Sequence, residues 1–255
     1  MGSATLAILQ KGNPNNKTFV HDPHLQKFYD GDRPDIAIVC TPCLSGNLDD
    51  PTFLKSIHPH HVIVRSTVNP NTFDKISHLL PGSTVSHWPE FLTMSTADRD
   101  AIFPDKVIFG TSLNSAAVPT FLNNLWGHFY RRWRDENLIV TDPETSAAIK
   151  LGINTLYSIK CAFNNLMFDI IGSQAGYNDW VEACGLDQRI TVSHEQIRHN
   201  GYRGFGGRCL PKDAMTLRDC TLTAKQRRFI QELLNMNEEW LGKPIGQVLK
   251  DEWGG

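Results

Sequence analysis

The segment Gly201–Asp213, GYRGFGGRCLPKD, places a thiol, a cation and a carboxylate directly after four glycines. Glycines this close together mark a turn, or a backbone that lies tightly against a ligand. A reactive thiol needs access and nearby positive charge, and Cys209 has Arg208 before it and Lys212 after it. Asp213 follows the thiol by one helical turn, where it could hold a water molecule or act as a base. The alternative is a glycine-rich turn before a helix whose cysteine is merely small and buried.

A second polar pair, Lys150 and Asn154, interrupts a largely apolar stretch. Residues four apart share one face of a helix, so the two side chains should project together. A lysine at such a place could serve as an electrophile or as the partner of an oxyanion. The alternative is a polar stripe that faces solvent.

Short apolar runs recur through the first part of the chain, and their Val and Ile content is typical of buried parallel strands. Helical patterns, such as Thr52–Ile57 and Val118–Phe129, lie between several of them. Strands that alternate with helices predict an α/β fold with a parallel sheet. The predicted strands are Thr18–His21, Asp35–Cys40, His61–Ser66, Thr84–Ser86, Lys106–Phe109 and Leu138–Val140.

The pattern changes after Asp142, and we place the domain junction near residues 141–146. From Glu144 to Cys184, apolar residues recur at helical spacing with few breakers, which predicts one long and mostly buried helix. A second helix is predicted for Thr223–Trp240.

The composition excludes several classes of protein. A net charge of −2 over 255 residues gives no basic footprint for nucleic acid. No apolar run approaches the roughly 18 residues that span a bilayer, and the N-terminus has no secretory signal pattern. Six irregularly spaced cysteines fit free thiols in a reducing compartment, so we expect a cytoplasmic protein.

The glycine–cysteine segment resembles the signature of the nucleotide-sugar 6-dehydrogenases, the UDP-glucose and GDP-mannose dehydrogenase family. Six further motifs resemble this family and follow in the family's order, so the resemblance covers residues 20–240. They are VCTP at Val39–Pro42, STV at Ser66–Val68, PEFL at Pro89–Leu92, FPDKVIFG at Phe103–Gly110, AAIKLGINTLYSIK at Ala147–Lys160 and GLDQRI at Gly185–Ile190.

The resemblance implies a Rossmann domain that binds NAD, a central helical region that carries the cysteine and the dimer contact, and a further domain that holds UDP. We therefore expect a reduced NAD-binding domain over residues 1–142 and a central catalytic and dimerisation domain over residues 143–255, with the UDP-binding domain absent. The expected fold class is α/β: an incomplete Rossmann-like parallel sheet, followed by an all-helical central domain with a long core helix. A homodimer through the central helices is expected.

The resemblance also implies a reaction. The family oxidises the C6 alcohol of a nucleotide sugar to a carboxylate and consumes two NAD⁺. A thiol adds to the intermediate aldehyde, and water later cleaves the thioester. By resemblance to the family, Cys209 is the nucleophile and Lys150 stabilises the oxyanion. Asn154 and Asp213 position a sugar hydroxyl and water.

Further roles carry over by motif. Glu90 is the candidate base for thioester hydrolysis, and Thr67 orients water or the nicotinamide. The implied substrate-binding residues are Phe91, Leu92, Arg189, Phe205 and Gly206, and the implied cofactor-binding residues are Asp22, Thr41, Pro42, Ser66, Val68 and Lys212.

The chain also departs from the family. No strand with the first glycines of G-x-G-x-x-G precedes Gly2, which could be the last of these glycines. Asp22, 20 residues later, would then be the acidic residue that binds the ribose. Without the first strand, the sheet has a gap or Thr18–His21 pairs with Asp35–Cys40. Trp88 replaces the asparagine that precedes the family's PEFL motif.

Two alternatives to the enzyme follow from these departures. One is a non-catalytic scaffold or sugar-nucleotide-binding remnant, and the other is a fragment of a split enzyme. A third feature, the CxxC of Cys40 and Cys43, could be redox-active or half of a zinc site. Because no second CxxC or suitable histidine pair accompanies it, we expect no metal.

Overall fold

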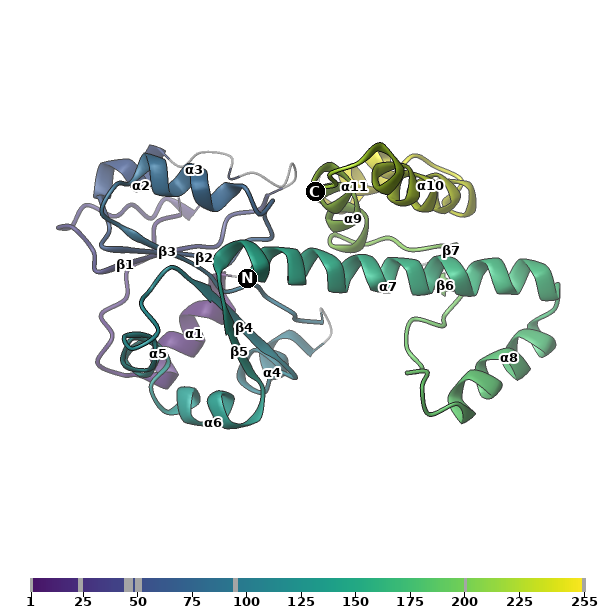
Figure 1. Cartoon of the computed structure of the whole chain (residues 1–255), viewed down its shortest axis with the longest axis horizontal. Coiled ribbons are helices and arrows are strands. Elements are labelled where there is room, and N and C mark those ends of the chain that lie inside the picture. The colour runs from purple at the N-terminus through teal and green to yellow at the C-terminus, as the bar shows by residue number, and fades with distance from the viewer. Residues whose placement is uncertain are drawn as a thin grey trace. The chain divides into compact units, whose positions relative to one another are not determined.

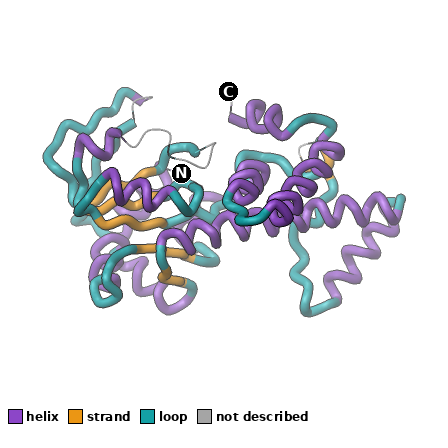
Figure 2. The backbone as a smooth tube through the Cα atoms, turned by 45° about the horizontal axis from the view of Figure 1, so that its top comes forward, coloured by secondary structure: helices purple, strands orange, loops and turns teal. Residues whose placement is uncertain are grey.

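The computed structural model describes residues 2–22, 25–43, 48, 52–93, 96–199 and 201–253. The chain forms two compact units, Met1–Lys150 and Leu151–Gly255, whose boundary falls inside the long helix α7 (Pro143–Ile171). The first unit contains the sheet, and the second is mainly helical (Figures 1 and 2). Each unit is described by itself below.

A five-stranded sheet in the order β1-β2-β3-β4-β5 forms the centre of the first unit. Its neighbours pair in parallel, except that β3 and β4 are antiparallel. The α/β class is confirmed, and the expected parallel sheet forms except for this one antiparallel pair. The strands are β1 (Ile36–Val39), β2 (His61–Val64), β3 (Thr84–His87), β4 (Val107–Thr111) and β5 (Leu138–Thr141).

Helices cover both faces of this sheet (Figure 1). Along β1, Ile36 and Ile38 pack against one core cluster and Ala37 and Val39 pack against another. This alternation follows from the two-residue period of a strand. The helices are α1 (Gly2–Gly12), α2 (Thr52–Ile57), α3 (Thr72–Leu79), α4 (Ala97–Ile102), α5 (Val118–Trp126) and α6 (His128–Glu136).

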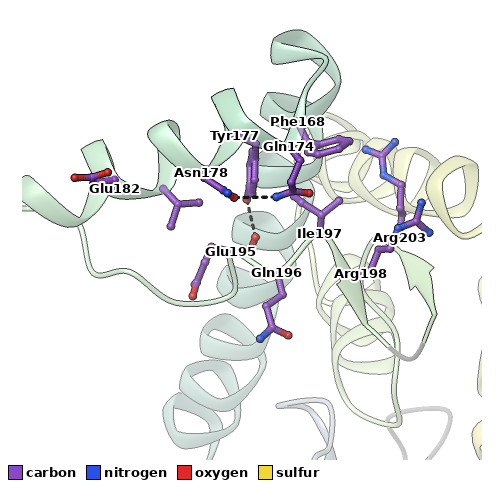
Figure 3. Close-up of a pocket in the computed structure, with 11 residues that line it drawn as sticks. Phe168, Gln174, Tyr177, Asn178, Glu182, Glu195, Gln196, Ile197, Arg198 and Arg203 are labelled. Atoms are coloured by element: carbon purple, nitrogen blue, oxygen red, sulfur yellow. Dashed lines mark hydrogen bonds between the residues drawn. The ribbon is translucent and has the colours of Figure 1, made fainter.

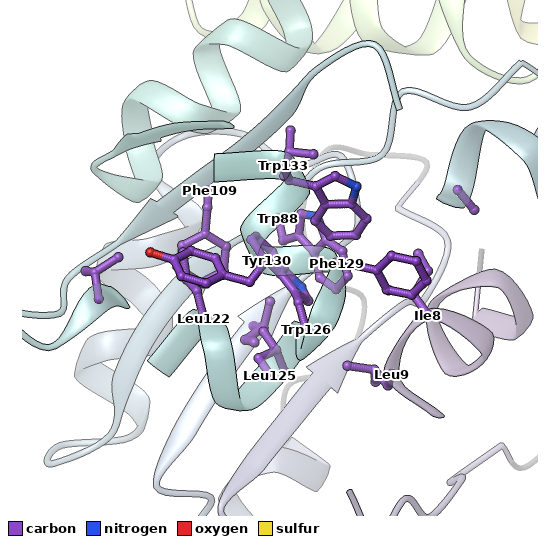
Figure 4. Close-up of a cluster of buried hydrophobic side chains, with 14 residues drawn as sticks. Ile8, Leu9, Trp88, Phe109, Leu122, Leu125, Trp126, Phe129, Tyr130 and Trp133 are labelled. Carbon is purple, nitrogen blue, oxygen red and sulfur yellow. The ribbon is translucent and has the colours of Figure 1, made fainter. Parts of the chain in front are cut away.

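Three tryptophans dominate one of these clusters (Figure 4). The ring centroid of Trp126 lies 4.9 Å from that of Trp88 and 5.0 Å from that of Trp133. Their relative exposures are 3% or less. Because large aromatic rings bury more apolar surface than any other side chain, this cluster is a major source of the first unit's stability.

The predicted strand Thr18–His21 is wrong. Residues 16–21 have no regular structure, and Asp22 makes only an isolated bridge with Lys27. Phe19 is 73% exposed, so its apolar side chain is not buried against the sheet and does not hold this run beside a strand. Among the described residues, β1 therefore ends the sheet on one side.

The predicted helix Val118–Phe129 is wrong in its extent, because Gly127 separates α5 from α6. Gly127 has φ +55°, and a Cβ atom there would lie 1.9 Å from the carbonyl oxygen of Gly12. This close approach of two backbones requires glycine and ends α5.

The predicted single helix from Glu144 to Cys184 is also two helices, α7 and α8 (Gln174–Leu186). Gly172 has φ +74°, a conformation that ends a helix and that side chains rarely permit. Ser173 then caps α8 by accepting a hydrogen bond from the Gly176 amide at 3.2 Å.

The remaining elements of the second unit pack around a third core cluster. The helix predicted for Thr223–Trp240 is confirmed as α10, and Thr223 forms a capping box with Gln226. A two-stranded hairpin departs from the expected all-helical domain. The elements are β6 (Arg198–His199), β7 (Tyr202–Arg203), α9 (Leu210–Asp219), α10 (Ala224–Leu241) and α11 (Ile245–Trp253). Among the described residues, no helix combines the length and apolar character that crossing a membrane requires.

Candidate functional site

Cys209 stands at the N-terminus of α9, and its side chain is exposed. Its carbonyl oxygen accepts a hydrogen bond from the Asp213 amide at 2.9 Å, so the first helical turn closes on the thiol residue. Pro211 lies in that turn, where a missing amide hydrogen leaves no partner unsatisfied. The N-terminus of a helix stabilises a nearby negative charge.

The glycines before the thiol are required by the loop itself. Gly204 and Gly207 have φ +82° and +75°, which side chains rarely permit. A Cβ atom on Gly206 would lie 2.5 Å from the hydroxyl of Tyr202. The predicted substrate residue Phe205 is only 2% exposed and lies in the core of the second unit.

Asn154 of α7 forms a buried polar group with Lys212 and Asp213, which belong to the first turn of α9. Asn154 Nδ2 donates to Asp213 Oδ2 at 2.6 Å, while Lys212 Nζ pairs with Asp213 Oδ1 at 2.5 Å. Their relative exposures are 6% or less. The structure thus brings together Asn154 and Asp213, which the motifs predicted for one task. It also places Lys212, predicted for the cofactor, on the same carboxylate.

Several predicted cofactor residues follow the carboxyl ends of β1 and β2, the edge at which open α/β sheets bind ligands. Ser66 Oγ donates to the carbonyl oxygen of Thr41 at 2.6 Å, which ties the two strand ends together. Thr67 is half-buried and Pro42 is exposed. Val68 is fully buried and packs in the core rather than facing a ligand.

The predicted base Glu90 is paired with a buried arginine. Arg65 Nη2 lies 3.2 Å from Glu90 Oε2, and Nη1 donates to the carbonyl oxygen of Trp88 at 3.1 Å. Its Nε donates to Thr5 Oγ1 at 3.1 Å, and the guanidinium lies 3.9 Å from the Trp88 ring centroid. Burial lowers the pKa of Arg65, while the charge of Glu90 acts in the opposite direction.

Lys150 is buried, and its Nζ lies 4.8 Å from the ring centroid of Phe91. Lys106 Nζ lies 4.7 Å from the same ring, so Phe91 contacts two cations. Phe91, Leu92 and Glu90 line a cavity of about 70 Å³ in the first unit. The motif PEFL therefore places a carboxylate and an aromatic ring along one cavity wall.

A buried histidine lies at the end of β3. His87 Nδ1 lies 2.9 Å from Ser146 Oγ, and Nε2 lies 3.2 Å from the carbonyl oxygen of Ser66. Burial, with smaller contributions from Arg65 and Lys150, lowers the pKa of His87 to about 3. The imidazole is therefore neutral at physiological pH.

Two predicted ligand residues lie in turns. Arg189 has a side chain that is 88% exposed and pairs with Asp187 at 2.6 Å. Asp22 Oδ1 accepts a hydrogen bond from the Leu25 amide at 3.2 Å.

The site therefore fits a dinucleotide only in part. Thr41, Ser66 and Thr67 stand at the strand ends where a nicotinamide would bind. The strand expected to carry Asp22 does not form, so the residues of the adenosine side do not fit as predicted.

The cysteines of the CxxC bond to neighbouring oxygens. Cys40 Sγ donates to Thr5 Oγ1 at 3.8 Å, and Cys43 Sγ donates to the Thr41 carbonyl oxygen at 3.7 Å. Burial raises the pKa of the Cys40 thiol. Within the described part of the chain, no group of three or more His, Cys, Asp and Glu side chains could hold a metal ion.

A cavity of about 570 Å³ lies in the second unit, between the end of α7, α8 and the segment before β6 (Figure 3). Tyr177 points toward this segment and donates to the carbonyl oxygen of Glu195 at 2.6 Å. Gln174 donates to Asn178 at 2.9 Å on the α8 side. None of the predicted site residues lines this cavity.

Sequence reasoning missed two residues of the site. Arg65 directly precedes the STV motif, and a charge at the end of a buried strand was an available signal. Asn237 contacts the backbone of Phe205 from α10. It occupies a buried position in the apolar stripe of α10, and a polar residue there was the second signal.

Comparisons with known proteins bear on both units. Residues 144–239 match the central domain of the UDP-glucose/GDP-mannose dehydrogenase family. UDP-glucose 6-dehydrogenase of Rickettsia conorii is 32% identical over 161 residues, which cover 61% of this chain and 35% of that protein. The Rickettsia typhi protein of the same name is 31% identical over 195 residues, which cover 73% and 43%.

The fold comparison extends further along the chain. The structure of a UDP-glucose dehydrogenase from Pyrobaculum islandicum matches with a TM-score of 0.66 and 21% identity, over 93% of this chain and 61% of that one. The chain spans less than half of the length of the two curated relatives named above. The motif order and the central-domain match point to the same family: residues 144–239 are similar to the central domain of the UDP-glucose/GDP-mannose dehydrogenases, and the chain shares the fold of a UDP-glucose dehydrogenase.

Proposed function

We propose that this chain oxidises the C6 alcohol of a nucleotide sugar of the UDP-glucose type to the uronate, with Cys209 as the nucleophile. The observation that carries the proposal is the exposed thiol at the start of α9, one turn from the buried Lys212–Asp213–Asn154 group. NAD⁺, when bound, accepts one hydride in each of the two oxidation steps. The named relatives act as UDP-glucose 6-dehydrogenases, which supports the substrate class.

The residues would act in sequence. Cys209 Sγ adds to the C6 aldehyde and forms a thiohemiacetal, whose oxyanion Lys150 stabilises. The second oxidation gives a thioester on Cys209. Water then attacks the thioester carbonyl and releases the carboxylate and the free thiol.

Water activation would fall to the carboxylates. Glu90 would take the proton from the attacking water, and Thr67 would orient that water or the nicotinamide. Asp213 and Asn154 would position water and the sugar hydroxyl through the oxygen and amide that already bond one another. Phe91, Leu92, Arg189 and Gly206 keep their proposed tasks at the substrate, and Thr41, Pro42, Ser66 and Lys212 keep theirs at the cofactor side, whereas the buried side chains of Phe205 and Val68 and the position of Asp22 do not favour the tasks proposed for them.

NADH formation tests the proposal. The chain is mixed with NAD⁺ and UDP-glucose, GDP-mannose or UDP-N-acetylmannosamine, and the absorbance of NADH is followed. Cys209→Ala should lower turnover by at least about 10³-fold, whereas the matched variant Cys220→Ala should leave it unchanged. Absence of NADH with every sugar, or full turnover by Cys209→Ala, would overturn the proposed mechanism.

The expected homodimer is a further proposal, with a second copy of the chain covering α7. Leu156, Phe163 and Ile170 follow one another at seven-residue spacing on this helix and are 54%, 51% and 68% exposed. This spacing places them in one stripe, as in paired helices. Phe163→Glu should shift the mass in solution from dimer to monomer, whereas Leu222→Glu, on a 94% exposed side chain, should not.

A second candidate is a non-catalytic scaffold or sugar-nucleotide-binding protein. The observation that favours it is the strand Thr18–His21, which does not form beside β1. Titration calorimetry separates the candidates. Binding of UDP-glucose without binding of NAD⁺ would support the scaffold, and binding of both would support the enzyme.

A further inference from the structure

One buried side chain bonds both polar groups of a single residue in the glycine loop. Asn237 of α10 is 0% exposed. Its Oδ1 accepts a hydrogen bond from the Phe205 amide at 2.7 Å, and its Nδ2 donates to the Phe205 carbonyl oxygen at 2.8 Å. The side chain therefore replaces the pairing that a neighbouring strand would give, at a point where the loop enters the core.

The position of Asn237 makes this contact specific. It belongs to the buried stripe of α10 that includes Ile230, Leu234 and Leu241. An apolar residue at this position would avoid the cost of removing a polar amide group from water. The contact also sets the sequence of the loop. A Cβ atom on Gly204 would lie 2.4 Å from Asn237 Oδ1, so the position of Asn237 requires a glycine at residue 204.

The other end of the loop is fixed by α7. Arg203 Nε and Nη2 donate to the side-chain and backbone oxygens of Asn165, each at 3.1 Å. Arg203 Nη1 pairs with Asp169 at 2.7 Å. The loop is thus attached to α7 through Arg203 and to α10 through Phe205, four residues before the thiol.

We infer that Asn237 is a positioning residue, which holds the Phe205 peptide and thereby fixes Cys209 Sγ at the N-terminus of α9. Only Gly206, Gly207 and Arg208 separate Phe205 from the thiol, and two of these three residues lack a side chain to restrict them. Without the asparagine, the loop loses this attachment to α10, and the orientation of Cys209 Sγ at the start of α9 is less restricted. The catalytic meaning of this positioning rests on the proposed function.

Three variants test the inference. Asn237→Leu keeps the approximate volume and removes both hydrogen bonds. Asn237→Asp keeps the acceptor for the Phe205 amide and loses the donor. Asn235→Leu is the matched control, because Asn235 lies two residues away on the same helix and its side chain bonds Gln231 and Glu232 of that helix.

The primary measurement is the rate at which iodoacetamide alkylates Cys209, read peptide by peptide with Cys184 as the internal reference. This rate needs no enzymatic activity. In Asn237→Leu it should fall about two- to fivefold, the factor that corresponds to the effect of a helix N-terminus on a charge. Asn237→Asp should give an intermediate rate, and Asn235→Leu should match the unmodified chain.

A rate unchanged in folded Asn237→Leu, with folding checked by circular dichroism, would overturn the inference. If Asn237→Leu does not fold, Asn237→Asp decides by the same comparison. NADH formation separates this result from the proposed function. An unmodified chain that forms no NADH contradicts the proposed function alone, and an active chain whose kcat and KM are unaffected by Asn237→Leu contradicts the positioning role alone.

Discussion

The two units each bury an ion pair, and the two pairs are built differently. In the first unit, Arg65 and Glu90 have side chains that are 3% and 15% exposed. In the second, Lys212 and Asp213 are 7% and 1% exposed. The guanidinium of Arg65 donates to three different residues, whereas Lys212 and Asp213 are neighbours on one helical turn.

This difference indicates different tasks. A guanidinium is a rigid fork, and Arg65 uses it to join α1, through Thr5, with the segment Trp88–Glu90 that follows β3. An ammonium is a compact point charge. Lys212 and Asp213 join few elements but stand beside the exposed thiol. Arg65 therefore connects elements of the first unit while it holds Glu90 in place, whereas Lys212 and Asp213 lie in the helical turn that begins at the thiol residue.

The largest expected change in stability follows from breaking the Arg65–Glu90 pair. Arg65→Met should lower the free energy of unfolding of the first unit by about 3–5 kcal/mol, because Glu90 loses its buried partner. Urea unfolding measures the loss. Arg189→Ala, which removes an exposed pair, should change it by less than about 1 kcal/mol. A similar small change in both variants would contradict the structural role of Arg65.

Acid should also distinguish the units. Burial lowers the pKa of His87 to about 3 and of His61 to about 4, from about 6.5 in the unfolded chain. Below pH 6.5 these two histidines bind protons in the unfolded state but not in the folded state. The free energy of unfolding therefore falls between pH 6.5 and about 3. Hydrogen exchange at pH 7 and pH 5 should show this loss in the first unit, and His87→Gln should reduce it.

The pair in the second unit should matter less for stability and more for activity. Lys212→Met should cost about 1–3 kcal/mol, because Asp213 keeps the amide of Asn154 as a donor. The double variant Lys212→Met with Asp213→Leu should recover most of that stability while NADH formation remains lost. Retained turnover in the double variant would show that the pair is only structural.

The smallest effect concerns a helix end in the second unit. Thr223→Ala removes the hydroxyl that accepts from the Gln226 amide at 3.2 Å, and it should cost about 1 kcal/mol. Thr223→Ser keeps the hydroxyl and serves as the control. Thermal unfolding measures both, and a cost confined to Thr223→Ala would assign the transition to the second unit.

Sequence patterns correctly predicted the helices and strands whose hydrophobic pattern matches the packing around them. Five of the six predicted strands form, and each of them pairs with a neighbouring strand of the sheet. The capping residue Thr223 correctly starts α10. Thr18–His21 has the same composition but finds no neighbour, and β-propensity without a partner makes no strand.

The site could be predicted only as far as its motifs reach. The spacing of Cys209 and Asp213 gives the first turn of α9 directly. Asn237 and Arg65 act through residues that are 32 and 25 positions away in sequence, respectively. Such contacts depend on how helices and strands pack, and no local period records them. The break at Gly172 likewise depends on a backbone angle rather than on hydrophobic pattern.

The tryptophan cluster gives the first unit an optical signature of its own. The ring centroids of Trp88 and Trp133 lie 4.9 and 5.0 Å from that of Trp126, so these chromophores share a rigid, asymmetric environment. Such environments produce near-ultraviolet circular dichroism that disappears when side-chain packing loosens, even where helices and strands persist. Trp180 and Trp240 of the second unit are half-buried. Loss of this signal therefore reports loosening of the sheet core before the backbone unfolds.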